Sequence, residues 1–172
     1  MCEYCGCQAL RSIALLTREH DTLVTLTGSA TSALHEGGLR AARPFVQQLV
    51  DLLDVHTAVE EEGLFPALTR EFGAHVHRLV EDHRAVDQVL QEVLARPGPA
   101  PVRGEDTSER GLSRRLVDGF YRLREHILAE QDGAFPAALA CLSPEQWSVV
   151  DEVGKQVRAG GSGASGRSIA RV

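Results

Sequence analysis

The stretch HTAVEEEGLFPAL, residues 56–68, recurs later in the chain as HILAEQDGAFPAAL, residues 126–139. Each copy opens on a histidine, places a glutamate four residues later and continues into a Gly-x-Phe-Pro-Ala sequence. On an α-helix this spacing puts the histidine and the glutamate on one face, about one turn apart. The two pairs are His56 with Glu60 and His126 with Glu130. The repeat therefore predicts two helices in matching register, each carrying one His–Glu pair.

Another histidine with acidic neighbours stands upstream of each copy: His20 in REHDTLV and His83 in EDHRAVD. A single histidine on a helix is more often exposed or satisfied in the core than a metal ligand, and one His-x-x-x-Glu pair stabilises a helix by roughly a few tenths of a kcal/mol. Here the four histidines fall one per predicted helix among apolar neighbours. Burying them and two carboxylates without partners would cost on the order of several kcal/mol each. The pattern favours six side chains that converge on a site for two metal ions.

Composition excludes several classes of function. The chain has 172 residues, enough for one domain, with a formal net charge of −6 and 5% aromatic residues. It has no Lys/Arg-rich run and no aromatic platform, so a nucleic-acid partner is not expected. No apolar stretch approaches the roughly 18 residues of a membrane span, and cysteines stand where a signal peptide would be basic and apolar. We expect a cytoplasmic protein with reduced thiols, whose oligomeric state the sequence does not decide.

Helical periodicity runs through most of the chain, without any alternating strand pattern. The spacing predicts an all-α fold: an up-down antiparallel four-helix bundle with a short C-terminal fifth helix. Gly37-Gly38 is expected to end the first helix, and Pro66 and Pro136 to kink or end theirs. The expected helices cover residues 9–35, a stretch from residue 44 to residue 66 or shortly beyond, and residues 74–95, 112–141 and 144–158; a Pro/Gly-rich connection covers residues 96–111. The domain organisation is a cysteine-containing segment at 1–8, the bundle with its fifth helix at 9–158, and a Gly/Ser-rich tail at 159–172, predicted to be disordered.

The types of ligand restrict the choice of metal. Four neutral nitrogens and two carboxylates, with no thiolate in the set, suit a borderline or hard cation. One carboxylate from each half can bridge two ions and leave each ion with two histidines. Six-coordinate iron would then have room for an oxo or hydroxo bridge and for a small exogenous molecule. Zinc fits such a site too but performs no redox chemistry there, and manganese or a mixed-metal centre stays open.

With these residues the chain resembles the hemerythrin-like, HHE cation-binding family, from His20 to Leu139. Its ligand pattern, H, HxxxE, H, HxxxE, is similar to that of the six-ligand members. The resemblance implies an up-down four-helix bundle around a non-haem di-iron centre. It also implies ligand roles, in which His20 and His56 hold one iron, His83 and His126 hold the other, and Glu60 and Glu130 bridge the two iron ions.

Two departures from the oxygen-carrying members bear on function. Leu79 stands where those proteins have a fifth histidine, and Gln131 stands where they have a bridging aspartate, so Glu130 takes over that role. Fewer nitrogen donors and a longer carboxylate should favour the ferric state and open a coordination position. We therefore predict catalase- or peroxidase-like turnover of hydrogen peroxide or a related small oxidant. The alternatives are a non-enzymatic module that binds or senses oxygen, nitric oxide or iron, and a purely structural bundle.

The N-terminal cysteines form a C-x-x-C-x-C cluster of Cys2, Cys5 and Cys7. This cluster is a candidate accessory metal or redox site, to which Cys141 or a second chain could add a ligand. A mobile, oxidisable end without metal is an equally good interpretation.

Several other polar residues are less informative. Tyr121 and Asp87 lie close enough to the ligand faces to support the metal site, although helix packing for Tyr121 and solvent exposure for Asp87 are the simpler expectations. The remaining histidines and acids are expected to be exposed; they are His35, His75, His77, Glu61 and Glu62.

Overall fold

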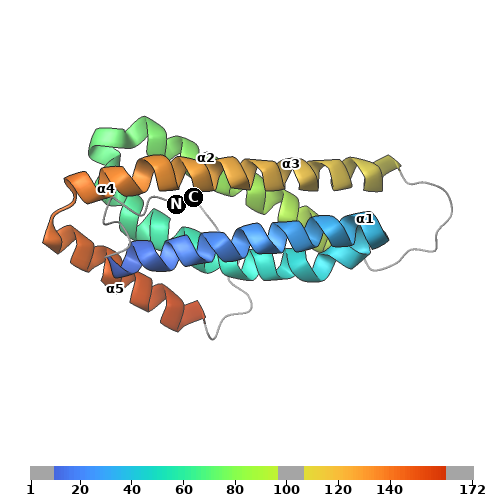
Figure 1. Ribbon diagram of the computed structural model, residues 1–172, viewed down its shortest axis with the longest axis horizontal. Helices are drawn as coiled ribbons and strands as arrows, with labels where there is room; N and C mark the ends of the chain where they lie inside the picture. The colour runs from blue at the N-terminus through green and yellow to red at the C-terminus, as the bar shows by residue number, and fades with distance from the viewer. Residues whose placement is uncertain (1–9, 97–106, 162–172) are drawn as a thin grey trace.

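The computed structural model describes residues 10–96 and 107–161, and every regular element within them is helical (Figure 1). The all-α class predicted from the sequence is therefore confirmed for these residues. The elements are α1 (Arg11–Val59), η2 (Glu60–Leu64), α2 (Phe65–Ala95), α3 (Thr107–Ala129), η3 (Glu130–Ala134), α4 (Phe135–Cys141) and α5 (Pro144–Gly161). Cys2, Cys5 and Cys7 lie outside the described residues, as do most of the Pro/Gly-rich connection and of the C-terminal tail.

Helix α1 folds back on itself at Gly37 and Gly38, as the sequence predicts. Gly38 has φ 68° and ψ −166°, a conformation that is essentially restricted to glycine. The Nε2 atoms of His20 and His56 lie 3.0 Å apart, whereas 36 residues of straight helix would separate them by about 54 Å. We call residues 11–36 and 39–59 the first and second limbs of α1, and Figure 1 shows them side by side.

Helix α2 bends at Phe72, whose φ of −123° and ψ of 28° are not helical. The bend returns the chain along the bundle, because Glu61 and His83 are in contact even though they precede and follow it. The fourth expected helix begins at Thr107 rather than at residue 112. The helix passes through Gly111, which the sequence predicts to be part of the connection.

A π-helical turn precedes each proline of the repeat. The N–H of Phe65 bonds to the carbonyl of Glu60, and the N–H of Phe135 bonds to that of Glu130. Widening the turn places Pro66 and Pro136 at the start of a new helical segment, where a missing N–H costs little. The chain therefore continues as a helix beyond both prolines instead of ending at them.

Two apolar clusters form the core, and the histidines fall between them along the chain. On the first limb of α1, His20 is flanked by Leu16 of one cluster and Leu23 of the other. On α2, His83 is flanked in the same way by Leu79 and Val86. A buried polar layer thus separates two apolar regions of the bundle.

Helix α5 packs across α1 and η2 at the end of the molecule where the chain leaves α4 (Figure 1). Its N-terminus has the predicted capping box, in which the Ser143 N–H donates to Gln146 Oε1 at 2.8 Å and the Gln146 N–H donates to Ser143 Oγ at 3.3 Å. The helix continues to Gly161, slightly beyond the expected end at residue 158.

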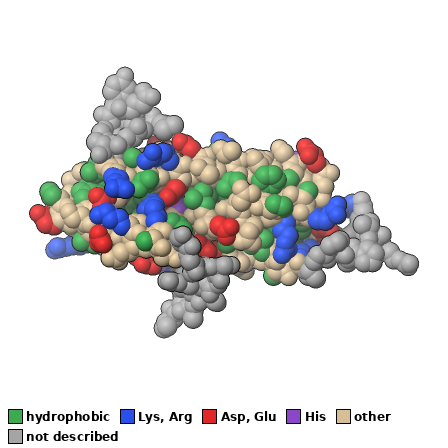
Figure 2. All heavy atoms as spheres, turned by 90° about the horizontal axis from the view of Figure 1, so that it is seen from below, with side chains coloured by type: hydrophobic (Ala, Val, Ile, Leu, Met, Phe, Trp, Pro, Cys, Tyr) green, Lys and Arg blue, Asp and Glu red, His purple; other side chains and the backbone are tan. Residues whose placement is uncertain are grey.

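The surface mixes acidic and basic side chains on the face seen in Figure 2, where little histidine surface is visible. Among the described helices, none is long and apolar enough to cross a membrane.

Candidate metal centre

Six buried side chains from α1, η2, α2, α3 and η3 meet in the polar layer. They form two groups that could each hold a metal ion, with ligand atoms within 4.8 Å of one another. The His20–His56 group comprises these two histidines with Glu60 and Glu130, and the His83–His126 group comprises the other two histidines with the same glutamates. Both glutamates are 0% exposed, and His83, at 8%, is the most exposed of the six. The structure thus brings together all six residues that the sequence singles out.

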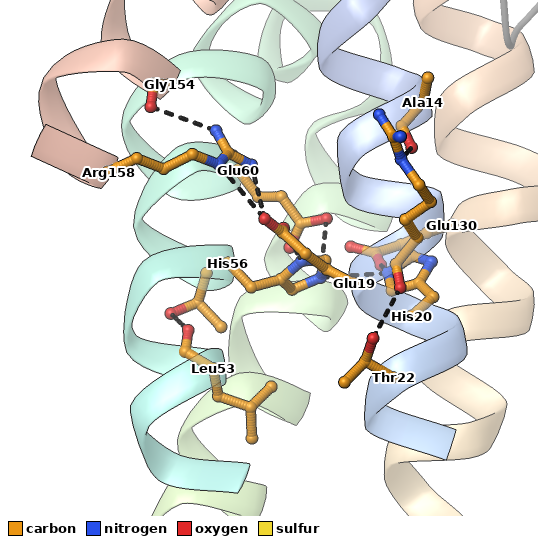
Figure 3. Close-up of polar contacts among 12 residues, drawn as sticks. Ala14, Glu19, His20, Thr22, Leu53, His56, Glu60, Glu130, Gly154 and Arg158 are labelled. Carbon is orange, nitrogen blue, oxygen red and sulfur yellow. Dashed lines mark hydrogen bonds and ion pairs between the residues drawn. The ribbon is translucent and has the colours of Figure 1, made fainter. Parts of the chain in front are cut away.

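Each glutamate divides its two oxygens between the groups. Glu60 places Oε1 3.4 Å from His56 Nε2 and Oε2 3.4 Å from His83 Nε2. Glu130 places Oε2 3.1 Å from His20 Nε2 and Oε1 3.2 Å from His126 Nε2. Within each group the two histidine Nε2 atoms are 3.0 Å and 2.9 Å apart. Figure 3 shows the His20–His56 side of this arrangement.

The carboxylates lack conventional hydrogen bonds, which fits a site built for cations. All four oxygens of Glu60 and Glu130 are buried without a hydrogen-bond partner. Two such carboxylates side by side would be costly unless positive charge compensates them. In the protein without metal, the histidines supply that charge. Burial raises the pKa of Glu130, but His126 and His20 outweigh it and hold that pKa well below its usual range.

The buried carboxylates in turn raise the pKa values of two of the histidines, His83 and His56. Burial lowers the pKa of His83, but the ion pair with Glu60 and the hydrogen bond with Glu61 outweigh burial and raise that pKa to about 10. The pKa of His56 is also raised, because Glu60 and Glu19 outweigh the effect of burial. A metal ion at this position would compete with these protons for the same nitrogen lone pairs.

Each histidine points its Nδ1 atom away from the cluster toward a polar side chain. Glu61 Oε1 lies 2.9 Å from His83 Nδ1, and Glu19 Oε2 lies 3.0 Å from His56 Nδ1. The other two partners are Asp82, whose Oδ2 is 4.0 Å from His126 Nδ1, and Gln131, whose Nε2 is 3.4 Å from His20 Nδ1. The expectation that Glu61 belongs to a solvated edge is therefore wrong. The π-helical turn rotates this side chain inward, where it is only 16% exposed.

These partners follow the sequence repeat, although our prediction from the repeat does not include them. The residue before each upstream histidine, Glu19 or Asp82, contacts the histidine of the repeat in its own half. The residue after each repeat glutamate, Glu61 or Gln131, contacts the upstream histidine of the other half. Such outer partners orient metal-binding imidazoles and raise their basicity.

The repeated phenylalanines follow the same crossed pattern. Phe65 stacks on the ring of His83 with centroids 5.8 Å apart, and Phe135 stacks on the ring of His20 at 5.6 Å. Both phenylalanines are almost fully buried. The Gly-x-Phe-Pro-Ala sequence thus serves the cluster twice, since its proline accompanies the widened turn and its phenylalanine covers a histidine.

Helix α5 reaches the cluster through one arginine. Arg158 Nη2 donates to Glu19 Oε1 at 2.8 Å, while the other oxygen of Glu19 faces His56 (Figure 3). Burial raises the pKa of Glu19, but His56 and Arg158 outweigh it and lower that pKa. Glu19 therefore stays ionised and links the fifth helix to a candidate ligand.

The remaining candidates lie away from the cluster. Tyr121 is 67% exposed, so neither a role at the metal nor one in helix packing fits it. Asp87 is exposed and accepts a hydrogen bond from Gln91, as the simpler expectation has it. Cys141 is exposed and free. His35 and His77 are exposed, but His75 is half-buried against Gly133 of η3, so our expectation of an exposed His75 is wrong.

A comparison with protein families identifies a match that covers most of the chain. The family model described as the hemerythrin HHE cation binding domain matches residues 11–138. This range includes both copies of the repeat almost completely and all six clustered side chains. No curated protein and no solved structure matches the chain significantly.

Proposed function

The chain belongs to the hemerythrin HHE cation-binding family, and from this premise we propose that it binds two iron ions and uses them to bind or sense a small molecule. The observation that carries the proposal is the pair of buried glutamates. Each divides its oxygens between two histidine pairs, and none of these oxygens has a hydrogen-bond partner. Oxygen or nitric oxide would be the small molecule; if the protein senses iron, the filling of the two metal positions is itself the signal.

In this proposal the two groups act as two metal positions. His20 and His56 would hold one iron, His83 and His126 the other, and Glu60 and Glu130 would bridge them, as in six-ligand members of the family. Iron in this nitrogen- and oxygen-rich set would supply Lewis acidity and one-electron redox chemistry. The protein's own residues fix the spacing of the ions, exclude bulk water and orient the imidazoles through their Nδ1 atoms.

We also infer that the packed helices form an antiparallel four-helix bundle. Its members would be the two limbs of α1, the second part of α2 and α3, each of which contributes one histidine to the cluster. The reversals at Gly38 and Phe72 and the contacts between histidines on successive segments support this arrangement. Metal sites between facing helices are typical of such bundles.

Binding or sensing is favoured over the turnover of peroxide by what surrounds the cluster. Tyr121 and Asp87, the two side chains that the sequence offers as supports of the metal site, are both exposed. The ionisable groups that face the Nδ1 atoms of the histidines are Glu19, Glu61 and Asp82, which suits them to hold the imidazoles in place. Peroxide turnover and a cytoplasmic location stay predictions.

Metal analysis joined to optical spectroscopy tests the proposal. The protein is expressed with iron available, its iron content is measured, and spectra are recorded after addition of oxygen, nitric oxide or hydrogen peroxide. We expect about two irons per chain, as the two ligand groups imply, and a lasting spectral change without consumption of the added molecule. Oxygen evolution from peroxide would favour turnover instead. Protein without iron, or with zinc alone, would contradict both readings.

Replacing one bridging carboxylate tests the ligand assignment. Glu130→Gln keeps the shape of the side chain but removes the charge shared by both metal positions. We expect it to weaken metal binding by more than the 10–100-fold typical of outer partners. Glu125→Gln, an exposed change on the preceding helix α3, is the matched control and should bind metal normally. A Glu130→Gln protein with full iron content would show that the assignment is wrong.

A further inference from the structure

Building on the proposed metal centre, we propose that its two positions bind metal unequally, and that Gln131 is the positioning residue that makes the His20–His56 position the weaker one. Three of the four histidines face a carboxylate at Nδ1, whereas His20 faces the neutral amide of Gln131. The amide stands at the repeat position that Glu61 occupies in the other half.

A carboxylate partner prepares an imidazole for metal. An ionised carboxylate only accepts hydrogen bonds, so Glu61 and Glu19 keep a proton on Nδ1 of His83 and His56. In the neutral imidazole, the Nε2 lone pair then points into the cluster without any rearrangement. The negative partner also raises the donor strength of that lone pair.

An amide partner neither holds a proton on Nδ1 nor raises the donor strength of the Nε2 lone pair. Gln131 presents its side-chain amide to Nδ1 of His20 at 3.4 Å. A neutral amide can either donate to this nitrogen or accept from it, so Gln131 does not fix a proton on Nδ1. When His20 binds a metal through Nε2, Nδ1 must carry the ring proton and the amide must present its oxygen to that proton. Even then the acceptor is neutral, so His20 is the weakest of the four donors.

Both histidines of the other position face a carboxylate, although Nδ1 of His126 makes no hydrogen bond. His83 has the shortest of the three carboxylate contacts at Nδ1, at 2.9 Å. His126 faces Asp82 at 4.0 Å, and Asp82 is held on its outer side by Arg122 Nη1 at 2.7 Å. That contact is long, yet it puts a fixed negative charge behind the imidazole. The His83–His126 position therefore fills first.

Stepwise titration with cobalt(II) tests this order. Metal-free full-length protein is titrated against a competing chelator, and the visible absorption of the bound ion is followed. We expect two resolved steps in the natural sequence. Gln131→Glu should tighten the second step by about 10-fold, the lower end of the range for outer partners, and leave the first nearly unchanged. Gln48→Glu, which makes the same change at an exposed site, should alter neither step.

Asp82→Asn provides the converse test, because it should weaken the first step selectively. A spectroscopic readout separates a positioning role from a merely structural one. The paramagnetically shifted Nδ1–H proton signal of His20 in the cobalt protein should move in Gln131→Glu and stay in Gln48→Glu.

The possible results separate this inference from the proposed function. Two equal binding steps, or a second step that Gln131→Glu does not change, would overturn the inequality while leaving the metal centre intact. Protein that binds no cobalt at all would overturn the proposed function and this inference with it. A second ion bound weakly by the natural sequence and firmly by Gln131→Glu would support the inference.

Discussion

At the scale of single residues, the cluster is a set of charges that are balanced differently with and without metal. Without metal, the buried glutamates rely on protonated histidines, as the raised pKa of His83 and the lowered pKa of Glu130 indicate. With metal, the cation would take over that role and the histidines would be neutral. The charges of the six side chains are thus balanced both with and without metal, which explains how these side chains can be buried in an apolar core.

The raised pKa of His83 predicts how the metal-free protein responds to pH. A folded-state pKa of about 10, against about 6.5 when unfolded, means that protonated His83 stabilises the fold. That stabilisation is fully present below the unfolded pKa and is lost as the pH rises from about 6.5 through 10. We expect the free energy of unfolding, measured with urea in chelator, to fall over this range. The decline should be smaller in His83→Gln, and equal declines in both proteins would contradict this account.

At the scale of elements, the π-helical turns and the fifth helix set the geometry of the site. Both turns begin at a repeat glutamate and widen the helix just before a proline. Single π-turns within α-helices are often found at functional sites. Here each turn aims a glutamate, its following polar residue and a phenylalanine at the cluster. Helix α5 adds an outside support through Arg158 and Glu19.

Loss of the contact between Arg158 of α5 and Glu19 should weaken metal binding without unfolding the protein. Arg158→Gln removes the charge that holds Glu19 against His56, so the imidazole becomes freer to rotate. We expect metal affinity to fall by about 10-fold, the lower end of the range for outer partners. Lys155→Gln, an exposed change on the same helix, should leave affinity unchanged. Equal affinities of the two variants, measured by competition with a chelator, would show that α5 is not coupled to the site.

The reversal between the limbs of α1 depends on Gly38. Alanine at φ 68° and ψ −166° is strained, so Gly38→Ala should destabilise the protein by about 1–3 kcal/mol. Gly28 lies inside the helix with open space around its Cα, and Gly28→Ala should stabilise the protein by about 0.5–1 kcal/mol. Urea denaturation of the two variants measures whether the free energy of unfolding falls in Gly38→Ala and rises in Gly28→Ala. A neutral Gly38→Ala would mean that the chain reverses without this conformation.

At the scale of the whole molecule, a buried polar layer interrupts the apolar core. Leu16 and Leu79 belong to one apolar cluster, while Leu23 and Val86 belong to the other. Continuous apolar packing cannot cross this layer. The stability of the contact between the two regions therefore depends on how well the buried charges of the layer are neutralised. The metal ions that we propose would provide the strongest compensation, because they bind to groups from both halves of the repeat.

Metal should therefore raise the thermal stability of the entire domain. A ligand bound only by the native state, at a free concentration of a hundred times its Kd, stabilises by about 2.7 kcal/mol. For a chain of this size we expect the melting temperature to rise by about 5–10 °C. Calorimetry of the metal-loaded protein against the same protein in chelator measures the difference. An unchanged melting temperature would favour a purely structural bundle.

The sequence alone predicted the features that depend on spacing along one helix. The His-x-x-x-Glu pairs, the two upstream histidines and the break at Gly37-Gly38 follow from local periodicity and backbone freedom. The all-α class and the capping box of α5 follow for the same reason. Even the outer partners carry a signal in the repeat, since Glu61 and Gln131 occupy equivalent positions in its two copies.

Only the tertiary structure decided what faces these residues from other helices. Glu61 reaches His83 because a π-helical turn rotates it inward, and periodicity computed for a regular helix places it on the solvated side. Tyr121 is exposed and His75 half-buried because of how neighbouring helices pack, which spacing within one helix does not encode. The difference between Gln131 and the three carboxylates likewise acquired meaning only when His20 was found beside the amide. Contacts between segments distant in sequence depend on backbone geometry that each segment does not determine by itself.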